Sequence, residues 1–283
     1  MGFKTIFLGL LISVFIFSCG SKEEVKISIA EWSLHRKLKS GQLSNLDFPA
    51  YVREHYNIGA VEFVNQFFFD KANDTVYLSQ LKDNCLKSNI QPLLIMVDGE
   101  GDLAHLNDSV RNVAVNAHFK WIKAARFLGC HAVRVNLKGE GTEEECKSSS
   151  IKSLKALSNF GAQNQIHIVV ENHGGNSSNP NWLIDVIQDV NHKYCGTLPD
   201  FGNFYKYDRY EGVRLMMPFA QGVSAKSHGF NAQGEDTIVN FEQMSEIVKS
   251  NGYNGFIGVE YEGPNPNEDE GILKTIQLIK KHF

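Results

Sequence analysis

The sequence predicts a single α/β domain folded as a (β/α)8 TIM barrel. The first observation is a strand-like apolar run followed by a helix-like run, which recurs about eight times and is typical of parallel β/α units. The second is length, because removal of an N-terminal leader leaves roughly 265 residues, close to the ~250 of such barrels. No Pro- or Ser-rich linker divides this stretch. An open, doubly wound parallel sheet is the alternative arrangement of the same elements.

Eight short apolar runs are the predicted strands, and they span 26–32, 60–64, 92–97, 131–137, 166–171, 196–201, 222–227 and 256–261. The clearest helices between them span 74–88, 110–128 and 241–250, where apolar residues recur with helical spacing. Asp74 can cap the first of these helices, and Gly129 ends the second. The short joint AARFLGCHAVRV, from helix to strand, favours closely packed β/α units.

The N-terminus is predicted to be a signal peptide over residues 1–18. Lys4 precedes an apolar run of 12 residues, 6–17, which is too short to span ~30 Å of hydrocarbon. Cys19 follows a small residue, and IFSC resembles a bacterial lipoprotein signal. This resemblance implies lipidation of Cys19, export, and a lipid anchor in the cell envelope, on its periplasmic or surface side. Residues 19–25 would then be a tether and 26–283 the barrel; an N-terminal core element is the alternative.

Composition limits the partners that this chain can have. The net charge is −4, and no run of Lys and Arg is interleaved with aromatic residues, so a nucleic-acid partner is excluded. Contact with a membrane is expected only through the N-terminal lipid, and the oligomeric state is not indicated. Four further cysteines show no C-x-x-C spacing, so neither a metal site nor a disulfide pairing can be predicted from Cys85, Cys130, Cys146 and Cys195.

Ionisable side chains close the last four predicted strands, where the active site of a barrel lies. Glu171 ends IHIVVE, Asp200 lies in GTLPDF, Lys226 and His228 lie in or just after GVSAKS, and Glu260 lies in FIGVEY. Three carboxylates that lie together at the mouth of the barrel, shielded from water, repel each other. One divalent cation (Mn, Mg, Co or Zn) would remove that repulsion. The alternative is that each acid pairs with a Lys or Arg, for example Glu171 with Lys226.

Four motifs in this order, VEFV (61–64), VVENHGG (169–175), LPDFGNF (198–204) and GVEYEG (258–263), resemble the xylose isomerase-like TIM barrels. The resemblance implies that Glu171, Asp200 and Glu260 hold one divalent metal together with a histidine from strand 7. Ser224 stands where the family usually has this histidine, two residues before a strand-end Lys. His228 is the nearby imidazole, and it is expected to be a metal ligand if the chain bends over the mouth. A substrate-contacting loop residue or an uninvolved surface histidine are the other possibilities.

The same resemblance implies an activity on sugars. The DNA-repair endonucleases of this family use three zinc ions and many histidines, and the second and third predicted strands end without His. We therefore expect an enzyme for a small sugar or glycoside rather than a nuclease. Glu62, Asn136 and His173 are candidate substrate-binding residues at other strand ends, and Trp32 is a candidate wall against the carbon face of a sugar.

The predicted reaction is proton abstraction next to a carbonyl, through an enediolate, as in a sugar isomerase or epimerase. Glu171 and Glu260 would move the proton, and Lys226 would neutralise negative charge. Two alternatives remain open. A 3-keto-glycoside lyase or hydrolase would use the same proton abstraction to expel the C1 oxygen by β-elimination. A sugar-binding lipoprotein would have kept the barrel without catalysis.

Overall fold

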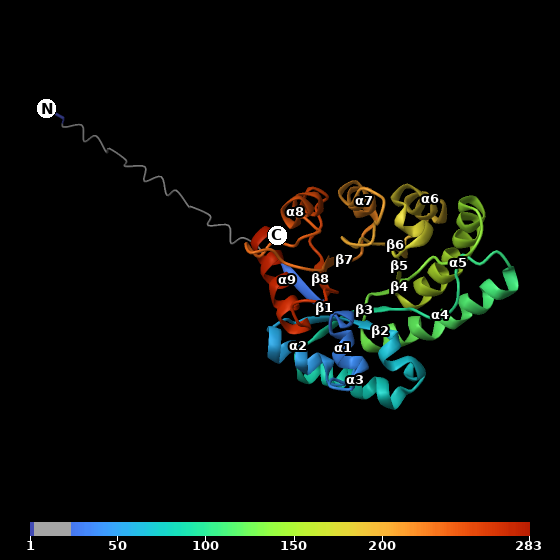
Figure 1. The fold of residues 1–283 in the computed structure, drawn as a ribbon, viewed down its shortest axis with the longest axis horizontal. Coiled ribbons are helices and arrows are strands. Elements are labelled where there is room, and N and C mark those ends of the chain that lie inside the picture. Colours follow the sequence, from blue (N-terminus) through green and yellow to red (C-terminus); the bar gives the residue numbers. More distant parts are fainter. Residues whose placement is uncertain (3–23) are drawn as a thin grey trace.

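The computed structural model describes residues 1–2 and 24–283, so the predicted signal peptide and Cys19 lie outside the described residues. Eight parallel strands form one sheet, with helices around it (Figure 1). The strands are β1 (Lys26–Ala30), β2 (Ala60–Val64), β3 (Gln91–Met96), β4 (Ala132–Val135), β5 (His167–Glu171), β6 (Cys195–Leu198), β7 (Val223–Ser227) and β8 (Phe256–Tyr261). This is the predicted single-domain (β/α)8 barrel.

The sheet order is β6-β5-β4-β3-β2-β1-β8-β7, which leaves β6 and β7 as its two edges. Isolated parallel bridges join these edges, at Thr197 with Ala220 and at Asp200 with Ser224. The amide of Ser224 donates to the carbonyl of Pro199 over 2.9 Å. The sheet therefore curls back on itself, and the open doubly wound alternative is wrong.

The principal helices are α1 (His35–Lys39), α2 (Phe48–Tyr56), α3 (Thr75–Lys87), α4 (Asp108–Leu128), α5 (Glu143–Asn164), α6 (Pro180–Val190), α7 (Arg209–Met216), α8 (Phe241–Ser250) and α9 (Glu268–His282). All three predicted helices are present. Helix α4 begins two residues before the predicted start because the Asn107 side chain caps it. No described helix has the length and apolar character that a membrane crossing requires.

The strand predicted over 26–32 is too long. The chain leaves β1 at Ala30 and turns through a 3-10 helix, η1 (Glu31–Leu34). The turn is held by Glu31, whose carboxyl group is fully buried and accepts from the Val64 amide and from the Asn45 side chain, each over 2.8 Å. Glu31 thus ties the end of β1 to β2, and burial raises its pKa to about 8.

Two separate apolar clusters fill the fold. The larger lies between the strands and the surrounding helices. The smaller consists of inward-facing strand residues that fill the barrel: Ala30, Val64, Leu94, Met96, Ala132, Val169 and Leu198. Trp32 and Phe67 pack against the smaller cluster and are only partly buried. The interior of the barrel is thus filled by the smaller cluster, and the polar site lies directly above it at the mouth. The four described cysteines are unpaired.

Candidate metal centre and active site

The three acids predicted from strand ends converge in space. Glu171 ends β5, Glu260 lies near the end of β8, and Asp200 follows β6 by two residues. Each side chain offers an oxygen, and these oxygens all lie within 4.8 Å of one another. The three residues are at most 4% exposed. Parallel strands produce this meeting because their carboxyl ends share one rim of the barrel.

Neutral donors hold these acids in place. The Ser224 hydroxyl lies 3.0 Å from Asp200 Oδ2 and 2.7 Å from Glu260 Oε2. Asn203 donates from Nδ2 to Glu171 Oε1 over 3.0 Å, and its amide donates to Asp200 Oδ1 over 2.9 Å. The carboxylates are therefore fixed before any ligand binds, as ligands of a metal site usually are.

Lys226 lies among three carboxylates. Its buried Nζ is 3.5 Å from Asp200, 3.4 Å from Glu260 and 3.4 Å from Glu262. It also donates to Asn203 Oδ1 over 3.3 Å. Burial opposes the charge of this lysine, but the surrounding acids outweigh that effect and raise its pKa well above the ordinary value. Lys226 is therefore a permanent cation in the site.

Arg134 is the second buried cation. Its Nη1 donates to Asp98 over 2.7 Å, and its Nε lies 2.9 Å from Glu171 Oε2 without the alignment of a hydrogen bond. Each of the three acids therefore contacts a Lys or Arg, as the alternative expected, but the example pair is wrong, because Glu171 contacts Arg134 on the neighbouring strand β4 rather than Lys226. Sequence gave no way to choose between two cations whose strands both border the mouth.

The site also fits a divalent cation. Among the described residues, Lys226 and Arg134 are the cations in contact with five carboxylates, of Asp98, Glu171, Asp200, Glu260 and Glu262. Negative charge is therefore in excess in a buried place, where it is costly. Glu171 Oε2 is buried and accepts no hydrogen bond. Three carboxylates within 4.8 Å are a suitable donor set for a hard divalent ion.

The pKa values of the buried acids shift in different directions. Burial is the main cause that raises the pKa of Glu171, Asp200 and Glu62, each to about 7. Burial acts on Glu260 too, but the charge of Lys226 and the Ser224 hydrogen bond oppose it and lower the pKa of that carboxyl. Without a bound metal, Glu260 is thus ionised at neutral pH, whereas the other three can exchange protons there.

Glu62 and Trp32 lie on two sides of this cluster. Glu62 on β2 accepts from the Ser28 hydroxyl over 2.6 Å, and its second oxygen is buried without a hydrogen-bond partner. Trp32 in η1 donates from Nε1 to Glu262 over 2.5 Å and lies against Phe67, with the ring centroids 6.1 Å apart. The partly exposed indole is a suitable surface for a polyhydroxylated ligand, whereas the second oxygen of Glu62 is enclosed by protein and lies against Gly258.

Asn136 and His173 lie together at one side of the mouth. Both line a cleft of 660 Å³ formed mainly by the loops 136–141 and 173–177. Asn136 donates to Asp98 Oδ1 over 2.7 Å, which connects the cleft to the Arg134 pair. The His173 side chain is exposed. These two predicted substrate residues therefore border the site rather than enter the acidic cluster.

The structure places His228 outside the acidic cluster. The set of ligand atoms within 4.8 Å of one another, found among the described residues, contains the three acids and no imidazole. His228 follows β7 on a loop, and its amide donates to Asp236 Oδ2 over 2.9 Å. Its half-buried ring has no partner at Nδ1. Its role as a metal ligand stays a prediction.

Glu262, Asn203 and Asp98 belong to the site but were not among the predicted site residues. Glu262 could have been found, because it lies two positions beyond Glu260 and strand alternation puts both on one face. Asp98 follows β3 by two residues, at the same rim. Asn203 gave no signal, because it lies in the loop after β6.

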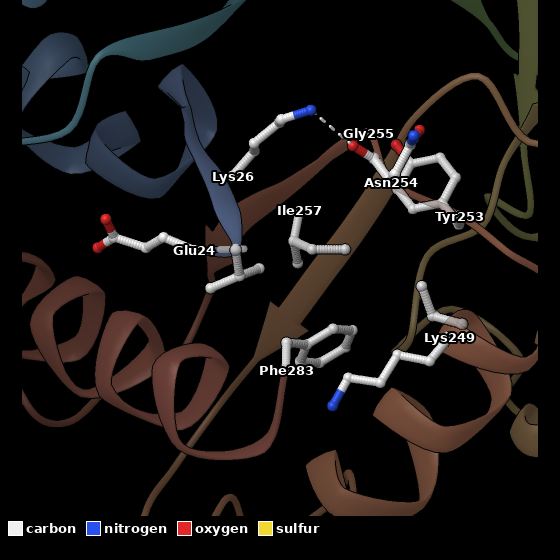
Figure 2. A pocket seen from close by; sticks show the side chains of 10 residues that line it. Glu24, Lys26, Lys249, Tyr253, Asn254, Gly255, Ile257 and Phe283 are labelled. Carbon is white, nitrogen blue, oxygen red and sulfur yellow. Dashed lines mark hydrogen bonds between the residues drawn. The ribbon is translucent and has the colours of Figure 1, made fainter. Parts of the chain in front are cut away.

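A second pocket lies at the opposite end of the barrel, where β1 and β8 begin (Figure 2). The start of β1, the end of α8 and the C-terminal Phe283 line it, and Lys26 donates to the carbonyl of Asn254 over 3.1 Å. Glu24 is the one acid among its lining residues. Because no group of acids converges there, the candidate active site is the mouth.

The sequence over residues 50–282 matches the family model described as xylose isomerase-like TIM barrel. The chain belongs to this family. As a xylose isomerase-like TIM barrel, it resembles several solved structures at low identity. No curated protein matches the sequence significantly.

Three solved structures illustrate the shared fold. L-ribulose 3-epimerase is 13% identical, with a TM-score of 0.73, and the match covers 91% of this chain and 94% of that one. The IOLI protein with a bound zinc atom is 16% identical, with a TM-score of 0.71, and 92% and 99% are covered. D-psicose 3-epimerase from Clostridium cellulolyticum H10, with D-tagatose, is 11% identical, with a TM-score of 0.70, over 91% and 99%.

Proposed function

We propose that this protein is a divalent-metal-dependent sugar isomerase or epimerase. The observation that carries the proposal is the convergence of Glu171, Asp200 and Glu260 within 4.8 Å at the barrel mouth. Two similar folds are those of sugar 3-epimerases, and another holds zinc. A cation held by the three acids would supply Lewis-acid stabilisation of negative charge that develops on substrate oxygens.

The protein's own groups then carry out two proton transfers. Glu260, which stays ionised, accepts the proton from the carbon next to the carbonyl, and an enediolate of the sugar forms. Glu171, in its protonated form, donates a second proton to a carbon of the enediolate. The Lys226 ammonium faces the same space and stabilises negative charge on the substrate. Glu62 accepts hydrogen bonds from sugar hydroxyls through its second oxygen.

Deuterium exchange tests this function. The chain from residue 24 onward is incubated with free ketoses in deuterated water, with and without chelator, and exchange at carbon is followed by NMR. Exchange without bond cleavage is expected, and Glu171→Gln and Glu260→Gln should each reduce it by about 10²–10⁴-fold. Glu242→Gln, an exposed change on α8, is the control. Absence of exchange with every ketose, or full exchange in the chelated protein, would contradict the proposal.

The cleft beside Asn136 favours a second candidate, a 3-keto-glycoside lyase. Its 660 Å³ adjoin the mouth and could receive the group attached at C1 of a glycoside. Proton loss at C2 would then expel the C1 oxygen, with the electron pair of the C–H bond forming the new double bond. Incubation with 3-keto-glycosides separates the two, because a lyase releases the aglycone and an epimerase does not. A non-catalytic sugar-binding protein would bind a ketose without any exchange.

We propose also that the chain is exported and anchored through a lipid on Cys19. The support is the apolar run 6–17 followed by Ser18 and Cys19. In bacteria that express the full chain, radiolabelled palmitate should enter the wild-type protein and the control Cys195→Ala. Cys19→Ala should abolish the label. Equal labelling of Cys19→Ala, or an unprocessed N-terminus by mass spectrometry, would refute the anchor.

A further inference from the structure

Ser224 occupies the point where the two halves of the acidic cluster meet. It lies on β7, is 1% exposed, and is bridged on one side to Asp200. On the other side it pairs in register with Gly258, two residues before Glu260. The hydroxyl is consequently within 3.0 Å of a carboxylate oxygen of Asp200 and within 2.7 Å of one of Glu260.

A serine hydroxyl cannot satisfy two ionised carboxylates by hydrogen bonding alone. It has one proton and two lone pairs, so it donates to one carboxylate while a lone pair faces the other. Two oxygens that are neighbours around a cation with bonds of about 2.1 Å in octahedral geometry lie roughly 3.0 Å apart. The two contacts of Ser224, 2.7 and 3.0 Å, have the length of O–H···O hydrogen bonds and are also compatible with adjacent oxygen ligands of one ion.

The donor atoms around Ser224 are all oxygens. The ligand atoms that cluster here come from three carboxylates, and the described residues add no imidazole or thiolate to that set. Glu171 contributes a buried oxygen, Oε2, that accepts no aligned hydrogen bond and lies 2.9 Å from Arg134 Nε. Lys226 and Ser224 contact different oxygens of Glu260, Oε1 and Oε2, but both contact Oδ2 of Asp200.

We propose that the Ser224 hydroxyl is the fourth protein ligand of the metal, which makes the site an all-oxygen one suited to Mn²⁺ or Mg²⁺. Carboxylate and hydroxyl oxygens are the ligands these hard ions prefer, whereas imidazole suits zinc. The proposal rests on the metal-dependent function proposed above and names the class of cation. His228, on its loop, then takes no part in binding the ion.

The experiment adds Mn²⁺ to metal-free protein and measures affinity by calorimetry and ligand type by pulsed electron paramagnetic resonance. The variants are Ser224→Ala, Ser224→His and His228→Ala, with Ser227→Ala as a matched control. Ser227 lies on the same strand, is equally buried, and contacts Thr275 instead of the acids. Circular dichroism confirms that each variant is folded.

The wild-type Mn²⁺ spectrum should lack modulation from a coordinated ¹⁴N, and Ser224→His should acquire it. Ser224→Ala should weaken Mn²⁺ binding about 10–100-fold, while Ser227→Ala and His228→Ala leave it unchanged. Nitrogen modulation in the wild type, an unchanged affinity in Ser224→Ala, or no Mn²⁺ binding would overturn the proposal. The deuterium-exchange assay is read separately, so Mn²⁺ bound as expected without exchange would refute the proposed function and leave the ligand assignment intact.

Discussion

Replacement of Lys226 by Met should destabilise the metal-free protein more than any surface charge does. The ammonium lies 3.4–3.5 Å from three carboxylates, and two of these, Asp200 and Glu260, are almost fully buried. Loss of one partner of a buried ion pair costs about 3–5 kcal/mol, because the remaining charges are uncompensated. For a domain of this size, each kcal/mol lowers the melting temperature by about 2–4 °C, so the expected decrease is about 6–20 °C.

The measurement is thermal unfolding of chelated protein at pH 8 and pH 6. The decrease should be smaller at pH 6, because the carboxyl of Asp200, whose pKa is about 7, can then be protonated and no longer needs a cation. Lys274→Met is the control, since that lysine forms an exposed pair with Glu270 that is worth ~0.5 kcal/mol or less. A decrease in Lys226→Met no larger than in this control would refute the reasoning.

Three further outcomes are expected. The chelated wild type should become less stable relative to chelated Glu62→Gln as the pH rises from about 4.5 through 7, because burial raises the folded pKa of Glu62 to about 7, above its unfolded value. The histidines whose pKa values burial lowers act in the opposite direction but are common to both proteins, and parallel pH profiles of the two melting temperatures would contradict the prediction. Glu62→Gln should leave the melting temperature within ~2 °C at pH 4.5, where the folded carboxyl is uncharged, and reduce kcat/KM for the sugar about 10-fold or more; unchanged kinetics would exclude Glu62 from substrate binding. Glu31→Ala should lower the free energy of unfolding by about 2–4 kcal/mol, because it leaves the buried Val64 amide without an acceptor. A decrease under ~1 kcal/mol in thermal unfolding would show that this hydrogen bond does not stabilise the fold.

The sequence was sufficient for the barrel and for the three acids, because both depend on local patterns. Each strand is an apolar run, and a carboxylate at its end must lie at the rim if the strands are parallel. Glu31 is a residue whose position the local pattern does not predict. It falls inside the strand predicted over 26–32, but it lies in η1 and accepts a hydrogen bond from the Val64 amide, 33 residues away. Such a contact has no local pattern.

The side chains that contact the acids could not be predicted from the sequence either. Whether Arg134 or Lys226 meets Glu171 depends on side-chain directions across neighbouring strands, and strand spacing alone allows both. Ser224 was recognised as the residue in the histidine position, but its two carboxylate contacts follow from the bridge between Asp200 and Ser224 that joins β6 to β7. The geometry of that junction is a property of the closed barrel rather than of either strand.

The packed interior of the barrel limits the routes by which small molecules can reach the three acids. Seven residues, each at most 1% exposed, fill the space beneath the acids. The pocket at the other end (Figure 2) is therefore sealed from them. In the proposed reaction, the substrate and the cation would enter by the mouth, and the product would leave by the same route. A molecule bound over Trp32 and Phe67 would block both the entry and the exit of small molecules at the mouth.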